Sequence, residues 1–276
     1  MEKEVLESFE NDDVRIRVYY DNYAWSPNSS YDMLGVMLFT YDNGKLHKEC
    51  DARELYGKWC DCYEKYTIKE ALAYLAMQKV THKNIVKFLK EGCEHYKLQY
   101  NRSKRAWQFL YNANEFGNND WKVEHTWLQS YFQNGDCDIN MLVELEKYEL
   151  VELINKYGNN IIATSLTTYG SCQGDIQEMF AYCTKERFNE LHSKPGKDWK
   201  EKAVECMKNE LKECGCWMWG NVYRVEVEEK VWFTKKYADG VESEDFEYRD
   251  AECGQTFYCE YAEEALEWVK QDYVHD

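Results

Sequence analysis

Apolar and polar residues alternate in two stretches near the ends of the chain, and a period of two residues is typical of half-buried β-strands. The first stretch covers residues 14–20 and the second covers residues 221–237. Shorter apolar or β-branched runs predict further strands at residues 34–41, 45–50, 161–168, 176–183, 244–250 and 256–260. The sequence Asp42-Asn43-Gly44 predicts a tight turn, because these residues accept the positive φ angles of hairpin turns.

Elsewhere, apolar residues spaced three, four and seven positions apart predict amphipathic helices. The predicted helices cover residues 68–80, 81–96, 106–116, 138–157, 199–213 and 262–273, and a short one follows Thr184. Thr67, Thr81 and Asp138 are suited to cap the starts of three helices, and Gly117 and Gly158 are suited to end two.

The order of these elements predicts the fold class. Strands gather towards both ends of the chain, without the regular alternation of strand and helix that builds a parallel sheet. We therefore predict an α+β protein, with a mostly antiparallel sheet built from the N- and C-terminal strands and a helical middle region. The predicted segments are residues 1–50 for the N-terminal strands, 51–157 for the helical region and 158–276 for a C-terminal α+β part.

The charge of the chain is negative and unevenly spread. The formal net charge is -17, and residues 225–276 hold 16 Asp and Glu against 5 Lys and Arg. Nucleic acids and anionic membranes attract positive protein surfaces, so this charge argues against direct binding to either. It favours a basic protein partner or imitation of a polyanion such as DNA, and a plainly solvated acidic face is the alternative.

The chain contains 12 cysteines, which in a secreted protein would suggest disulfides. The first residues show no secretory signal and no run approaches the length of a membrane span, so we expect a cytoplasmic protein with reduced thiols. Most cysteines are then small buried hydrophobes. The pairs Cys60-Asp61-Cys62 and Cys214-Gly215-Cys216 leave a four-thiolate zinc site open, but we predict no metal and no cofactor.

The densest aromatic cluster lies immediately before the long alternating stretch, and carboxylates follow it directly. Large rings contribute much of the affinity in protein interfaces, and carboxylates around them suit a basic partner. The predicted partner-binding residues are Trp217, Trp219, Tyr223, Glu226, Glu228 and Glu229. Packing of the same rings beneath a sheet is the alternative interpretation.

An enzymatic alternative comes from the same stretch, where Glu228 and Lys230 form an E-x-K pattern. In metal-dependent nucleases such a pair joins an upstream aspartate, here Asp175 or Asp198, to hold a divalent cation and polarise the attacking water. Alternating charges on an exposed strand produce the same pattern. No phosphate-binding glycine loop or nucleophile elbow is present, so we predict no catalytic residues.

Three blocks of the sequence resemble a family of uncharacterised proteins encoded by bacteriophages and other mobile elements. The blocks are Tyr20-Asp21, Ser26-Pro27 and Asp32-x-Leu34-Gly35-x-Met37; Gly174-Asp175-x-x-x-x-Phe180-x-Tyr182 with Thr184-Lys185-Glu186; and Gly220-Asn221-Val222-Tyr223 with Tyr261-Ala262-Glu263-Glu264-Ala265. Residues 45–155 lie outside the resemblance, and Asn28-Ser29-Ser30-Tyr31 and Met33 depart from the family pattern.

The resemblance implies a phage or mobile-element accessory protein that inhibits a host defence complex by stoichiometric binding. Its partner would be a defence or DNA-processing protein with a basic surface. Self-association into a homo-oligomer is left open. A third hypothesis is a sponge for a nucleotide signal, for which the basic residues between Lys83 and Arg105 are the only candidates.

Overall fold

The computed structural model describes residues 4–40, 44–47, 50, 66–92, 95–113, 120–128, 139–169, 176–192, 196 and 198–274. The chain forms two compact units. The first unit comprises Met1–Tyr31, Gly170–Asp175 and Lys212–Asp276, and the second unit comprises Asp32–Tyr169 and Ile176–Leu211. The first unit therefore joins the two ends of the chain.

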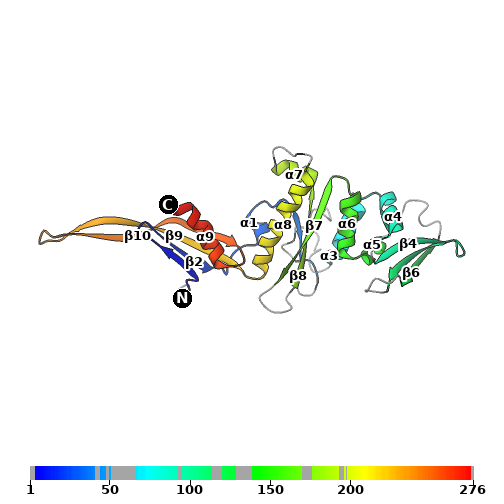
Figure 1. The fold of residues 1–276 in the computed structure, drawn as a ribbon, viewed down its shortest axis with the longest axis horizontal. Coiled ribbons are helices and arrows are strands. Elements are labelled where there is room, and N and C mark those ends of the chain that lie inside the picture. Colours follow the sequence, from blue (N-terminus) through cyan, green and yellow to red (C-terminus); the bar gives the residue numbers. More distant parts are fainter. Residues whose placement is uncertain are drawn as a thin grey trace. The chain divides into compact units, whose positions relative to one another are not determined.

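A four-stranded antiparallel sheet forms the centre of the first unit (Figure 1). Its strands, in spatial order, are β1 (Glu7–Glu10), β2 (Val14–Tyr20), β9 (Val222–Lys236) and β10 (Glu242–Tyr258). The register of β2 on β9 places Ile16 opposite Val227 and Val18 opposite Val225. This pairing confirms the prediction that strands from both ends of the chain share one antiparallel sheet.

Helix α9 (Ala262–Tyr273) covers one face of this sheet, and its bounds are those predicted from the apolar spacing. The alternating apolar residues of β2 and β9 are buried against Ala265, Leu266 and Val269 of the helix. The opposite face of the sheet carries the charged residues of the alternation. One buried face and one charged face explain the period of two along both strands. The short helix α1 (Pro27–Ser30) also belongs to this unit.

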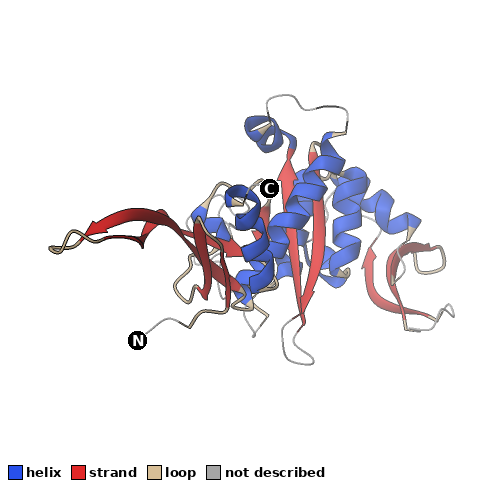
Figure 2. Ribbon diagram, turned by 60° about the vertical axis from the view of Figure 1, so that its left-hand side comes forward, coloured by secondary structure: helices blue, strands red, loops and turns tan. Residues whose placement is uncertain are grey.

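The second unit contains two antiparallel sheets of three strands and most of the helices (Figure 2). One sheet has the order β3 (Val36–Leu38), β8 (Ile176–Thr184) and β7 (Ile161–Tyr169), and the other has the order β4 (Tyr96–Asn101), β5 (Ala106–Asn112) and β6 (Trp121–Leu128). The helices are α3 (Ile68–Lys79), α4 (His82–Glu91), α5 (Ile139–Glu144), α6 (Lys147–Tyr157) and α7 (Lys185–Leu191). Helix α8 (Trp199–Met218) contributes residues to both units.

The middle of the chain is less helical than predicted. Residues 106–112 of the predicted third helix form strand β5, where Phe109 lies opposite Leu98 of β4. The preceding helix α4 ends at Glu91, so Tyr96 begins a strand and does not continue the helix. Aromatic residues fit a pleated strand as well as a helix face, and pairing with neighbouring strands decides between the two.

The predicted caps had different outcomes. The side chain of Thr67 caps the start of α3 as predicted, and Glu70 completes a capping box with it. Thr81 precedes α4, but its side chain makes no capping hydrogen bond. The predicted helix 138–157 is divided into α5 and α6, because Glu146 adopts an extended conformation and starts a second helix with its own capping box to Glu149. Asp138 and Gly117 lie outside the described residues. Within the part of the chain that the structure describes, no helix combines the length and apolarity needed to cross a bilayer.

Candidate functional site

The three aromatic residues predicted to anchor a partner lie in different environments. Tyr223 is only 4% exposed, because it belongs to the core under α9 and stacks on Tyr20 at 5.4 Å. Trp217 lies in the last turn of α8, and its indole N–H donates to the carbonyl of Ala24 at 3.4 Å. Trp219 follows the helix and is half-buried. Tyr223 is thus a core residue of the first unit, and Trp217 connects α8 to the loop that carries Ala24.

The carboxylates that follow do not form one exposed cluster either. Glu228 lies on the charged face of the sheet and accepts hydrogen bonds from Arg15 Nε at 2.6 Å and from an Arg17 terminal nitrogen at 2.8 Å. Glu226 pairs with Arg224 at 3.4 Å, and Glu229 is exposed. Each of the two paired carboxylates therefore meets a guanidinium group of its own sheet.

The same contacts bear on the nuclease alternative. Two guanidinium groups already neutralise Glu228, and Lys230 lies 3.7 Å from the carboxylate of Glu10. Asp198 belongs to the second unit and pairs with Lys202, and Asp175 lies outside the described residues. Among the described residues, no three His, Cys, Asp or Glu side chains gather as metal ligands. This geometry gives the nuclease hypothesis no support.

We expect Glu228→Ala to lower the free energy of unfolding by about 1–3 kcal/mol, because it leaves two part-buried guanidinium groups without their acceptor. Urea denaturation of the purified chain measures the loss. The neighbouring exposed Glu229→Ala is the matched control and should change stability by less than about 0.5 kcal/mol. Equal effects of the two substitutions would show that Glu228 does not hold the arginines in place.

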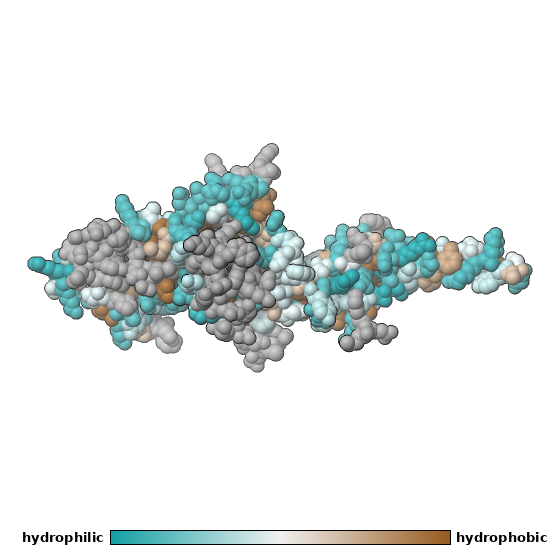
Figure 3. Space-filling model, turned by 180° about the vertical axis from the view of Figure 1, so that it is seen from behind, coloured by the Kyte–Doolittle hydropathy of each residue, from teal (hydrophilic) through white to brown (hydrophobic). Residues whose placement is uncertain are grey.

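Residues 230–248 form a hairpin that we call the β9–β10 arm. Strand β2 accompanies β9 as far as Glu229, and the backbone N–H of Lys230 donates to the carbonyl of Asp13 at 2.7 Å. From Val231 onward, β10 is the only described strand that pairs with β9. Large side chains along the arm are exposed, including Trp232 at 54% and Tyr237 at 53%; the full set is Trp232, Phe233, Tyr237, Val241 and Phe246. Figure 3 shows hydrophobic patches along this hairpin between hydrophilic ones. Among the described residues, no helix covers these side chains of the arm.

Contacts across the two strands order the arm. Trp232 lies opposite Phe246 with ring centroids 5.1 Å apart, and the ammonium group of Lys230 lies 4.4 Å from the Phe246 ring centroid. Ion pairs join Lys235 to Asp245 and Lys236 to Glu242. Cross-strand pairs of these kinds stabilise antiparallel ribbons. The pairs also neutralise much of the arm, so its main feature is aromatic and not acidic.

A cleft of about 450 Å³ lies elsewhere in the first unit. Five aromatic side chains and three polar ones line it: Trp25, Tyr31, Phe257, Tyr258, Trp268, Ser30, Glu213 and Thr256. The hydroxyl of Tyr258 donates to the carbonyl of Trp25 at 2.8 Å, and Thr256 donates to Asp21 at 2.9 Å. These bonds fix the loop that carries Trp25 against β10.

Three cysteines of the first unit, Cys214, Cys216 and Cys259, are buried thiols, as predicted for most of the chain's cysteines. Burial raises the pKa of Cys216 to about 11 and that of Cys259 to about 12. A thiolate is the form that binds zinc, and these environments disfavour it. Cys60 and Cys62 lie outside the described residues, so a site that combines the two Cys-x-Cys pairs stays untested.

The basic residues proposed for a nucleotide sponge do not share one helix. Lys83, Lys87 and Lys90 lie on α4, whereas Arg102 and Arg105 lie in the turn between β4 and β5. Lys87 pairs with Glu91 and Lys90 lies over the Trp107 ring. The positive groups of these described residues contact different neighbours and do not line a common pocket.

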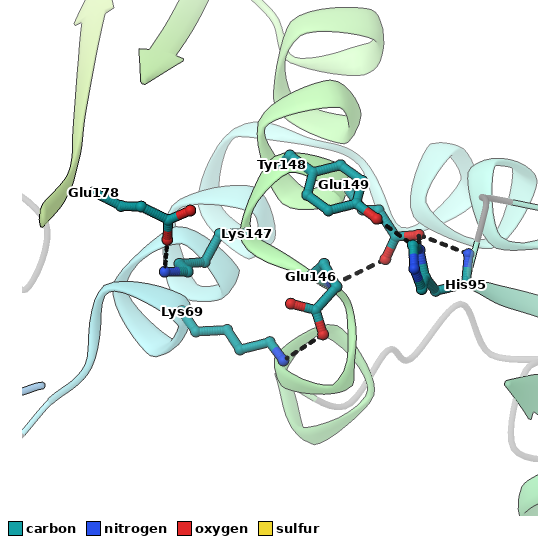
Figure 4. A network of polar contacts seen from close by, with 7 residues as sticks. All are labelled: Lys69, His95, Glu146, Lys147, Tyr148, Glu149 and Glu178. Carbon is teal, nitrogen blue, oxygen red and sulfur yellow. Dashed lines mark hydrogen bonds and ion pairs between the residues drawn. The ribbon is translucent and has the colours of Figure 1, made fainter. Parts of the chain in front are cut away.

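The second unit holds a polar network around a buried carboxylate (Figure 4). Glu149 is 1% exposed and accepts from the backbone N–H of Glu146 at 2.9 Å and of His95 at 3.1 Å. The Tyr148 hydroxyl lies 2.6 Å from His95 Nδ1. Burial raises the pKa of Glu149. The network joins the start of α6 to the start of β4, which is a structural role.

The raised pKa of Glu149 sets a pH dependence. An unfolded glutamate titrates near pH ~4.3, so from there up to the raised pKa the folded state holds the additional proton. Stability therefore falls as pH rises through this window. We expect the stability of the wild type relative to Glu149→Gln to decrease from pH ~4.5 upward, measured by urea denaturation. A difference that stays constant over this window would contradict this assignment.

Sequence reasoning missed the arm and the cleft, although each left a signal. The alternating stretch in β9 is 15 residues long, but β2 has only 7, so the far end of β9 has no third strand to pair with. Trp268 lies off the apolar stripe of α9 and is 48% exposed, and this position is the signal that the cleft left in the sequence. Comparison with family models, with curated proteins and with solved structures finds no match for this chain.

Proposed function

We propose that this chain acts by binding another protein, with the β9–β10 arm as its main contact element. One observation carries the proposal: five large side chains are exposed along a ribbon to which the described residues add no third strand and no covering helix. Exposed apolar surface of this kind marks interaction sites, and a two-stranded ribbon gains stability when a partner covers it. Trp232 and Phe246, which contact each other, are the proposed central anchors.

The proposed partner is a host defence or DNA-processing protein with a basic surface, which the chain inhibits by stoichiometric binding. Two features support this narrower proposal: the resemblance to mobile-element proteins and the net charge of -17. Excess carboxylates lie at the exposed side of α9, where Glu263, Glu267 and Asp272 accompany a single lysine, Lys270. Such charge speeds the encounter with a basic partner, while the arm supplies affinity.

Affinity purification of the tagged full chain, from several bacterial hosts that carry defined defence systems, tests the proposal. We expect one dominant protein that forms a complex of fixed stoichiometry with the chain in size-exclusion chromatography with light scattering. Recovery of no such protein would contradict the proposal. So would self-association of the chain alone that protects the arm in hydrogen exchange, because a second copy would then be its partner.

A further inference from the structure

The aromatic cleft of the first unit contains a carboxylate without a counter-ion. Glu213 lies in the part of α8 that lines the cleft and is half-buried. Burial raises the pKa of Glu213, and among the described residues no hydrogen bond or ion pair reaches its carboxylate. A half-buried charge of this kind is costly unless an opposite charge joins it. Among the described residues, no positive group in the cleft therefore pairs with this carboxylate.

The surroundings of Glu213 favour a cation further. Burial, with Asp21 and Glu213 adding negative charge nearby, raises the pKa of Tyr258. Negative charge thus lies near the cleft on Asp21, in the loop before Trp25, and on Glu213 of α8.

The rings of the cleft are accessible to a ligand. Trp25 is 75% exposed and Trp268 is 48% exposed, and both line the cleft with Tyr31 and Tyr258. Aromatic faces attract cations through the charge distribution of their π-systems. The cleft volume of about 450 Å³ lies within the range of small ligand sites. Aromatic walls with one carboxylate match a side chain that is flat, apolar on its faces and positively charged.

We propose that this cleft binds the guanidinium group of an arginine that a partner protein presents, with Glu213 as its counter-ion and Trp25 and Trp268 as its walls. This inference rests on the proposed protein-binding function. Arginine is favoured over lysine because its planar group stacks on rings and forms paired hydrogen bonds with a carboxylate. The cleft would add specificity for a basic segment to the affinity that the arm supplies.

Titration of the full chain, labelled with 5-fluorotryptophan, tests the proposal by ¹⁹F NMR. The ligand is acetyl-Gly-Arg-Gly-amide, and the control is the same peptide with citrulline, which keeps the shape and removes the charge. Trp25→Phe and Trp268→Phe assign the two resonances. We expect saturable shifts of both resonances with the arginine peptide and none with citrulline.

Glu213→Gln should weaken the binding of the arginine peptide by roughly tenfold, as expected for loss of a charge-assisted contact. Among the described residues the substitution removes no hydrogen bond or ion pair of Glu213, so the thermal unfolding curve should keep its position. Glu205→Gln, an exposed carboxylate of the same helix outside the cleft lining, is the matched control and should bind as the wild type does.

Three results would overturn the proposal: equal shifts with citrulline, unchanged affinity in Glu213→Gln, or tighter binding of tetramethylammonium than of the arginine peptide. The last would assign the cleft to a free organic cation. Failure here is distinct from failure of the proposed function, because arm substitutions test partner binding and leave the cleft unchanged. If arm substitutions abolish partner binding and the arginine peptide causes no ¹⁹F shift, the proposed function stands and only the cleft proposal fails.

Discussion

Replacement of Trp232 and Phe246 together by alanine is expected to weaken partner binding by about 100-fold or more. The two rings lie opposite each other on the arm, and they are exposed in the unbound chain. A central aromatic pair of this kind buries large area on a partner at little cost in side-chain entropy. Isothermal titration of the purified partner with each variant measures the loss.

The double substitution should leave the core between the sheet and α9 intact, because neither ring belongs to it; the substitution removes only the ring pair of the arm. The circular dichroism spectrum and the thermal midpoint of the variant provide this check. Tyr169→Ala, an exposed aromatic of the second unit, is the matched control and should bind like the wild type. Unchanged affinity in the Trp232/Phe246 variant would exclude the arm as the contact element.

The acidic residues of the first unit lie on two elements, and this refines the interpretation of the charge. On the arm, Asp245 and Glu242 pair with lysines, while Asp239 and Glu244 are exposed. On α9, Glu263 and Glu267 lie at the surface. Under the proposed function, the carboxylates of both elements steer a basic partner, and the rings of the arm anchor it.

The sequence was most informative where one face of an element is buried. Strand β2 and helix α9 have the predicted bounds, because each presents a regular apolar stripe to the same core. Prediction was wrong where pairing partners decide the conformation. Strand β5 contains residues that suit a helix or a strand, and only its pairing with β4 and β6 makes it a strand.

The candidate site was harder to predict than the fold. Tyr223 and Trp232 both belong to β9 and both follow an aromatic-rich pattern, yet one is in the core and the other is exposed. The difference depends on the length of β2 and on where α9 packs, and neither is visible from the residues themselves. The cleft likewise joins Trp25 to Trp268, which are distant in sequence and meet only in the folded unit.

The largest expected effect on stability comes from Glu210, a buried carboxylate of α8 in the second unit. Its two oxygens accept from the backbone N–H of Leu34 at 2.6 Å and of Gly35 at 2.9 Å. The guanidinium group of Arg187 donates to the carbonyl of Leu34 at 2.9 Å. A Cβ at Gly35 would lie 2.8 Å from the Met207 side chain, so the helix packs closely on this segment. Glu210 and Arg187 together therefore hold the segment that precedes β3.

Glu210→Ala should lower the free energy of unfolding by about 2–5 kcal/mol, because two buried N–H groups lose their acceptors. Glu210→Gln should cost less, since its amide oxygen can accept from one N–H while its NH₂ group faces the other. Hydrogen exchange of the Leu34 and Gly35 amides gives the local readout, and both should lose protection in the alanine variant. The exposed Glu205→Ala on the same helix is the control and should change neither quantity. Retained protection in Glu210→Ala would mean that packing of α8, and not the carboxylate, fixes this segment.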